Sequence, residues 1–258
     1  MSNTNVIPQG LFGPGILWLQ RTDIANATPM NVGFVNEVSF DFSFETKQLY
    51  GQNQYALLAA RGTAKTSGKI KAATVSGNAL NTILLGGTFT GGTQFDATTS
   101  PATPIPTTPF HITPVVPSSG TFVGDLGVRN AATGVPMTLV ASAPTAGQYA
   151  VAAGVYTFSS ADNVSGISVV IDFAYSFTTA PGESQTIANN PIGTTPTFQL
   201  TYKTALYGAS YFLQLFQCIG SKAAFAHKLT DFMMPEYDFE FFANAAQQIG
   251  IVSLATQA

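Results

Sequence analysis

Apolar and polar residues alternate along several segments of this chain, most clearly over residues 38–45. Val38 and three phenylalanines occupy the even positions, and serines, Asp41 and Glu45 occupy the odd ones. A period of two is typical of a β-strand that buries one face and leaves the other in water. We therefore predict a half-buried strand here.

A second strand is predicted over residues 61–72, where Lys65, Lys69 and Lys71 lie on one face and smaller or apolar residues on the other. If the two strands pair, the acids of the first face these lysines. Such cross-strand pairs contribute roughly 0.2–1 kcal/mol each.

One α-helix is expected over about residues 75–85. Ser76 can accept hydrogen bonds as its N-cap, and glycines 86 and 87 supply the stop. Within this segment the apolar residues follow helical spacing: Leu80, Ile83 and Leu84.

The remaining alternating segments predict further strands at residues 121–128, 137–141, 148–151, 155–158, 167–177, 197–206, 211–219 and 236–242. Short strands separated by turn signals are typical of a sandwich or barrel rather than of βαβ units. The predicted fold is mainly β, a β-sandwich or barrel with one flanking α-helix.

Residues 87–120 differ in composition, because threonine, glycine and proline dominate. Proline removes amide donors and fixes φ, so we expect an extended surface loop here without regular sheet. The predicted organisation is a core formed by residues 1–86 and 180–258. Residues 87–179 form a loop and a β-rich insertion between the two core segments.

Charge is sparse in this chain. Charged residues make up 9% of the sequence, against about a quarter in ordinary globular domains. So little charge protects a lone molecule poorly against association, which favours a structural subunit covered by copies of itself. The net charge of −3 argues against a nucleic-acid binder. We expect no membrane insertion, because the apolar runs are only a few residues long.

Candidate chemistry is scarce. His111 and His227 belong to no metal-binding motif, and the single cysteine, Cys218, is interpreted as a buried apolar residue in a protein made in a reducing compartment. Asp238 and Glu240 lie about 7 Å apart on one strand face, a spacing that a glycosidase also uses. We interpret them as a solvated or partner-facing surface, and we expect no enzymatic activity, cofactor or metal.

The charges are unevenly distributed along the chain. One group is basic and one, near the C-terminus, is acidic: Arg61, Lys65, Lys69 and Lys71, and Asp231, Glu236, Asp238 and Glu240. Two separately hydrated strand faces would explain them. Alternatively, they are contacts between subunits, in which the basic edge of one copy meets the acidic edge of the next.

The sequence resembles tail tube proteins of tailed bacteriophages in five segments: Asn36-Glu37-Val38-Ser39-Phe40 through Leu49-Tyr50-Gly51, Ala59-Ala60-Arg61-Gly62-Thr63-Ala64-Lys65 with Gly68-Lys69, Val75-Ser76-Gly77-Asn78-Ala79-Leu80-Asn81 with Leu85-Gly86, Gly147-Gln148-Tyr149 through Ala161-Asp162, and Lys228-Leu229-Thr230-Asp231-Phe232 with Pro235-Glu236-Tyr237-Asp238-Phe239.

This resemblance implies a virion subunit, made in the bacterial cytoplasm, that forms hexameric rings stacked into a tube through which DNA leaves. Its partners would be its own copies and the tape measure, sheath or tail-terminator proteins, and double-stranded DNA would pass without specific binding. A lumen with few lysines adheres little to DNA, so Lys69 and Lys71 are expected at subunit contacts. The insertion is expected on the outside or between rings.

Two other functions remain open. In the first, the chain is another virion structural protein, such as a capsid-decorating, baseplate or sheath-associated protein. Alternatively, it is a carbohydrate-binding β-sandwich that uses Tyr237, Phe239 and Phe241 beside the acidic residues.

Overall fold

The computed structural model of the chain describes residues 15–50, 52, 54–87, 89–206, 209–227 and 229–255. Fifteen strands and two short α-helices lie within these residues, so the predicted mainly-β class is confirmed. The chain divides into unit 1, formed by Met1–Phe89 and Thr186–Ala258, and unit 2, formed by Thr90–Gln185. Each unit has its own hydrophobic core.

Unit 1 is built on a sheet that closes on itself. Its six barrel strands pair in the order β12-β1-β2-β3-β14-β13, and β12 pairs with β13 as well as with β1. A seventh strand, β15 (Gly250–Ala255), pairs with the first half of β13. The bounds of the barrel strands are β1 Ile16–Arg21, β2 Met30–Tyr50, β3 Ala56–Ala72, β12 Thr197–Leu206, β13 Ala209–Ala224 and β14 Glu236–Phe242.

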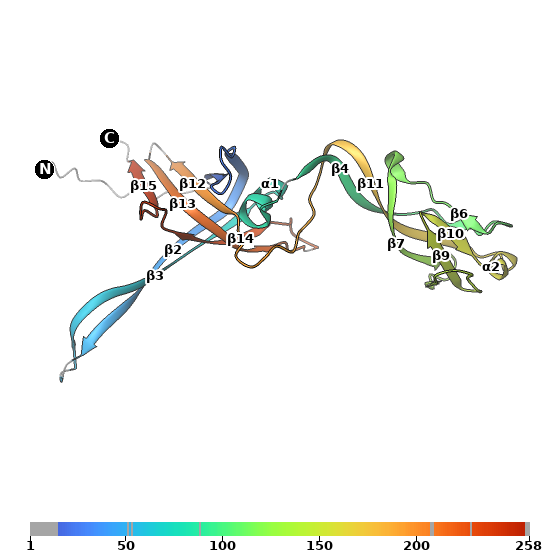
Figure 1. Cartoon of the computed structure of the whole chain (residues 1–258), viewed down its shortest axis with the longest axis horizontal. Coiled ribbons are helices and arrows are strands. Elements are labelled where there is room, and N and C mark those ends of the chain that lie inside the picture. Colours follow the sequence, from blue (N-terminus) through green and yellow to red (C-terminus); the bar gives the residue numbers. More distant parts are fainter. Residues whose placement is uncertain are drawn as a thin grey trace. The chain divides into compact units, whose positions relative to one another are not determined.

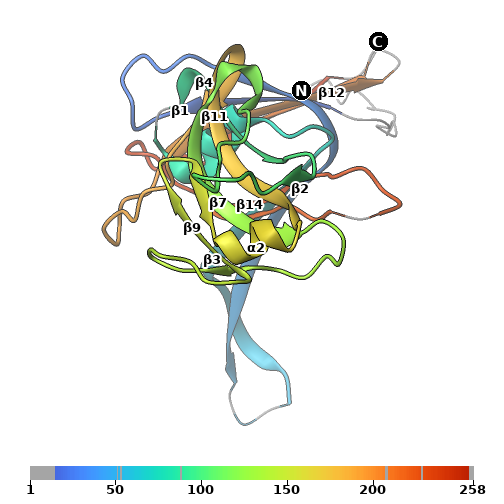
Figure 2. The same cartoon turned by 90° about the vertical axis from the view of Figure 1, so that its right-hand side faces the viewer.

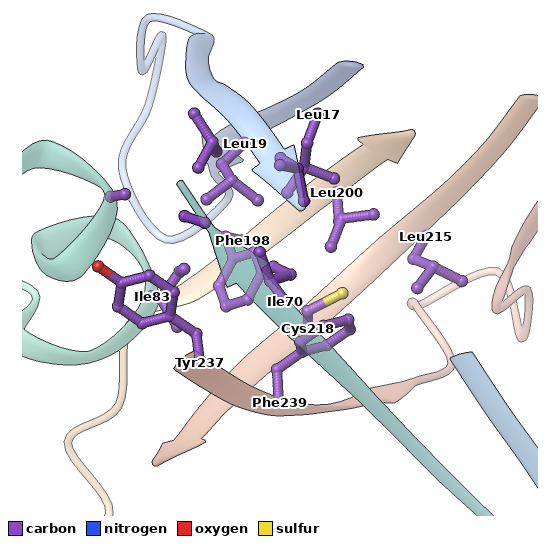
Figure 3. Close-up of a cluster of buried hydrophobic side chains, with 14 of the residues drawn as sticks. Leu17, Leu19, Ile70, Ile83, Phe198, Leu200, Leu215, Cys218, Tyr237 and Phe239 are labelled. Atoms are coloured by element: carbon purple, nitrogen blue, oxygen red, sulfur yellow. The ribbon is translucent and has the colours of Figure 1, made fainter. Parts of the chain in front are cut away.

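The barrel interior is filled by alternate residues of these strands (Figure 3). On β14, Tyr237, Phe239 and Phe241 are buried, as their alternation predicts. Cys218 of β13 is buried beside them, and this burial raises the pKa of its thiol. A Cβ on Gly68 of β3 would lie only 2.2 Å from the Phe239 ring, so the close approach of these two strands requires a glycine.

One helical segment of unit 1 packs against this core. Helix α1 (Gly77–Leu80) begins after Ser76, whose side chain accepts a hydrogen bond from the amide of Ala79. The segment continues as the π-helix η1 (Asn81–Leu85) and ends at Gly86, which has a φ of 69°. The predicted helix, its cap and its stop are confirmed. Ile83, one of the apolar positions in the prediction, is fully buried.

Unit 2 contains two small sheets around the long strand β11 (Ser168–Ser184). Strand β11 pairs with β4 (Thr90–Thr99) and β5 (Thr103–Pro104) on one edge and with β7 (Thr121–Asn130) on the other. Its odd positions from Val169 to Tyr175 are buried, as the alternation predicts. The second sheet is formed by β6 (His111–Ile112), β8 (Thr138–Leu139), β9 (Gln148–Ala152) and β10 (Val155–Phe158).

One prediction about the insertion was wrong. Residues 87–120 are not all loop, because β4 makes a regular ladder with β11. No proline precedes residue 101 in this stretch, so β4 keeps its amide donors. Unit 2 begins at Thr90 and ends at Gln185, within a few residues of the bounds 87–179 given to the insertion. Helix α2 (Ser160–Val164), which was not predicted from the sequence, lies between β10 and β11 and is capped by Ser159.

Candidate functional site

The charged residues proposed as contacts lie mostly on one outward face of unit 1. Strand β3 pairs with β2 on one side and with β14 on the other, and the register places Lys71 between Glu37 and Glu236. In the same way, Lys69 lies opposite Asp238.

The predicted pairing of the two strands is confirmed, but its acids do not face the lysines as expected. Asp41 lies opposite Ser67, and Lys65 and Lys69 lie opposite serines of β2. The acids opposite the lysines come from Glu37 and from β14.

These charges are paired within one chain. The Nζ of Lys69 lies 2.7 Å from Glu236 Oε2, and the Nζ of Lys71 lies 3.8 Å from Oε1 of the same carboxylate. The hydrogen bond from Lys69 holds the pKa of Glu236 below its usual value, and the same bond raises the pKa of Lys69. Asp238 lies 3.7 Å from the Nζ of Lys222 on β13.

This pairing changes the interpretation of the eight candidate residues. Four of them (Lys69, Lys71, Glu236 and Asp238) have partners in their own chain, so attraction between charges gives no reason to place them against a neighbouring copy. Asp231 lies exposed between β13 and β14, and Glu240 is exposed on β14. The structure does not bring Arg61 or Lys65 into this ladder. A role of the set in subunit contacts stays a prediction.

Arg61 and Lys65 belong to a feature that sequence reasoning missed. Beyond the barrel, β2 and β3 continue as a two-stranded antiparallel arm, which we define as residues 41–50 and 56–67 (Figures 1 and 2). No arm residue is buried, and all of residues 41–50 are exposed. The half-buried strand predicted for residues 38–45 is therefore wrong for its second half, where Phe42 and Phe44 are each 48% exposed.

The arm nevertheless carries aromatic and aliphatic side chains of the kind that are usually buried. Phe42 packs edge-to-face on Phe241 with ring centroids 4.9 Å apart, and the Arg61 guanidinium lies 4.5 Å from the centroid of the Phe44 ring. Toward the tip, Leu49 pairs directly with Leu58, and both are more than half exposed. Residues 48–60 contain no charged side chain. This uncharged run was the sequence signal that could have identified the arm.

An arm of this kind cannot be stable through its own packing. A two-stranded hairpin in water is marginally stable at best, because it buries too little apolar surface to offset the entropy of ordering. Natural proteins also protect unpaired strand edges with charge or proline. The uncharged tip has neither device, so the arm is suited to a surface that covers it.

The aromatic residues proposed for carbohydrate binding lie elsewhere. Tyr237, Phe239 and Phe241 face the barrel core, so they present no surface to a sugar. That set is ruled out as a binding platform. Among the described residues, no group of three or more histidine, cysteine or acidic side chains is arranged to hold a metal ion.

Unit 2 has a polar cluster in its core. The carboxylate of Asp125 accepts hydrogen bonds from the hydroxyls of Tyr149 at 2.6 Å and Tyr156 at 2.9 Å, and from the amide of Gly127 at 3.1 Å. Burial, followed by these bonds, raises the pKa of both tyrosines. Every hydroxyl in the cluster has a partner, so we interpret it as a structural network.

Because comparison with known proteins identifies no family, a proposal for the function rests on the fold and the geometry. No protein-family model matches the chain, and no curated protein matches it either. Two residues of the segments that resemble tail tube proteins, Gly51 and Lys228, lie outside the described residues. None of the helices in the described part of the chain has the length and apolar character that crossing a bilayer requires.

Proposed function

We propose that this chain is a structural subunit of a tailed-phage tail tube, forming stacked hexameric rings whose lumen conducts DNA. The observation that carries the proposal is the β2–β3 arm, which has apolar side chains on both strands and no core of its own. Such an element is stabilised only when another molecule covers it. Copies of the same chain are the simplest cover, because a subunit that repeats supplies its own partner.

The distribution of charge supports a conduit. The lysines of the outward ladder are neutralised by Glu236 within the chain, so this face offers little free positive charge to a polyanion. A DNA conduit needs weak adhesion, because each phosphate neutralised by a free lysine or arginine strengthens binding. The sparse charge of the whole chain also suits a surface that is largely covered by neighbours.

Electron microscopy of the purified protein tests the proposal. We expect rings or short hollow filaments to form without any other protein, as a self-assembling tube subunit requires. Solid particles, or single molecules at every concentration, would rule out the tube. A subunit that binds only to a preformed capsid or baseplate would show the second result, and the alternative virion roles would then be favoured.

A further inference from the structure

The arm of unit 1 has no neighbouring strand along its outer edges (Figures 1 and 2). Strand β1 pairs with β2 no farther than Phe34, and β14 pairs with β3 no farther than Gly68. From residue 41 to the tip, the described residues of β2 and β3 pair only with each other. A two-stranded ribbon is marginally stable and twists more strongly than a wide sheet. Strand pairing therefore does not fix the direction in which the arm leaves the barrel.

Two contacts at the base of the arm hold it to the barrel, and both end on Phe241 of β14. The ring of Phe42 packs edge-to-face on the Phe241 ring, and the hydroxyl of Thr66 donates a hydrogen bond to the Phe241 carbonyl oxygen. Phe42 and Thr66 lie directly opposite each other in the register of β2 and β3, so their side chains share one face of the arm. We call these two contacts the Phe241 anchor.

Phe241 is itself firmly held in the barrel. It is 2% exposed, it pairs with Cys218 of β13, and its ring centroid lies 6.4 Å from that of Phe239 in the core. Phe44 lies two residues beyond the anchor along β2, and the guanidinium of Arg61, also an arm residue, lies over its ring. The ring of Phe44 thus packs within the arm, whereas that of Phe42 packs on the barrel.

We propose that the Phe241 anchor fixes the direction of the arm before a second molecule covers it. Strand β3 extends about ten residues from Thr66 to its end at the tip. A bend of about ten degrees at the base would therefore move the tip by roughly 6 Å at the rise of a strand. An arm that is already held loses less conformational entropy on binding than an arm that swings. The anchor acts within one chain, so its role does not depend on which partner covers the arm.

Distances between two spin labels, measured on isolated single chains, test the proposal. One label is attached through Leu58→Cys near the tip of the arm and the other through Ser253→Cys on β15, and both positions are exposed. Cys218 stays in place, because it is buried. The arm with an intact anchor should give one narrow distance distribution. Phe42→Ala removes the ring contact and should broaden the distribution by roughly 5 Å, because the length of the arm amplifies a small bend at its base.

Phe44→Ala is the matched control, because Phe44 lies on the same strand with the same exposed fraction, 48%, but contacts Arg61 of the arm itself. This variant should keep the narrow distribution. Thr66→Val removes the hydrogen bond and should broaden the distribution in its own right. Equal widths in Phe42→Ala and Phe44→Ala would overturn the proposal, and so would an intact anchor that gives a distribution as broad as Phe42→Ala. Either result is read from single chains, so it would leave the proposed tube standing.

Discussion

Units 1 and 2 are both β-rich, yet they differ in how completely each satisfies itself. In unit 2 the longest strand, β11, is paired on both edges, its buried face is covered, and the buried tyrosine hydroxyls bond to Asp125. Unit 1 also has a closed barrel, but it leaves the arm and the strand β15 exposed. The comparison teaches that the surface suited to contact with another molecule lies mainly on unit 1.

The largest expected effect comes from removing a core ring in one unit at a time. Phe239→Ala in unit 1 and Phe173→Ala in unit 2 each delete a fully buried ring, which should lower the free energy of unfolding by about 3–5 kcal/mol. Because the cores are separate, calorimetry should show one transition moving while the other stays. If both transitions moved together in each variant, the two units would not be independent.

A smaller loss is expected when the polar network of unit 2 is broken. Asp125→Ala leaves the hydroxyls of Tyr149 and Tyr156 without their acceptor, at a cost of about 2–4 kcal/mol in unit 2. Asp125→Asn keeps an acceptor oxygen and should cost less. Chemical denaturation followed by tyrosine fluorescence measures both variants. Equal stability of Asp125→Ala and the wild type would show that the network contributes nothing.

Alkaline pH should destabilise the same network. In the folded protein the pKa of Tyr149 and Tyr156 lies above the unfolded value of about 10. The stability that the two neutral hydroxyls contribute to unit 2 is therefore fully present below about pH 10 and is lost as the pH rises above it. Each tyrosine should remove up to about 1.4 kcal/mol per pH unit from the stability of unit 2. NMR signals assigned to the two rings should show both hydroxyls ionising only on unfolding; ionisation of either ring near pH 10 in the folded state contradicts this.

The strands and helix ends that the sequence predicted correctly are those that local chemistry controls. Alternation identified β14 and β11 correctly, because one face of each strand packs against a core, and Ser76 and Gly86 set the helix ends through capping and a left-handed φ. Alternation also predicted that Phe42 and Phe44 are buried, which is wrong. Their period of two continues after the barrel ends, so the pattern alone cannot tell a core from a surface that awaits a partner.

The charged candidates illustrate the same limit. Runs of lysines and acids stood far apart in the sequence, and only the strand order β2-β3-β14 brings Lys69 next to Glu236. Strand order depends on long-range contacts that one sequence does not reveal. The arm was unpredictable for the same reason, since β3 pairs with β14 over only four residues and then continues beyond the barrel paired with β2.

A small gain in stability is expected at one position of unit 1. The hydroxyl of Tyr237 is buried and has no hydrogen-bond partner among the described residues. Tyr237→Phe removes this unsatisfied group and keeps the ring, so the free energy of unfolding of unit 1 should increase by about 1 kcal/mol. Thermal unfolding of this variant beside Tyr156→Phe, which breaks a hydrogen bond that is made in unit 2, tests the contrast. A loss of stability in Tyr237→Phe would contradict the interpretation.

The mass of the wild-type protein in solution, measured by sedimentation at micromolar concentrations, tests most directly whether copies of the chain cover the arm. One chain has a mass of 27.0 kDa. The account predicts a species of six chains or a series of its multiples. A single species of one chain at every concentration would contradict it.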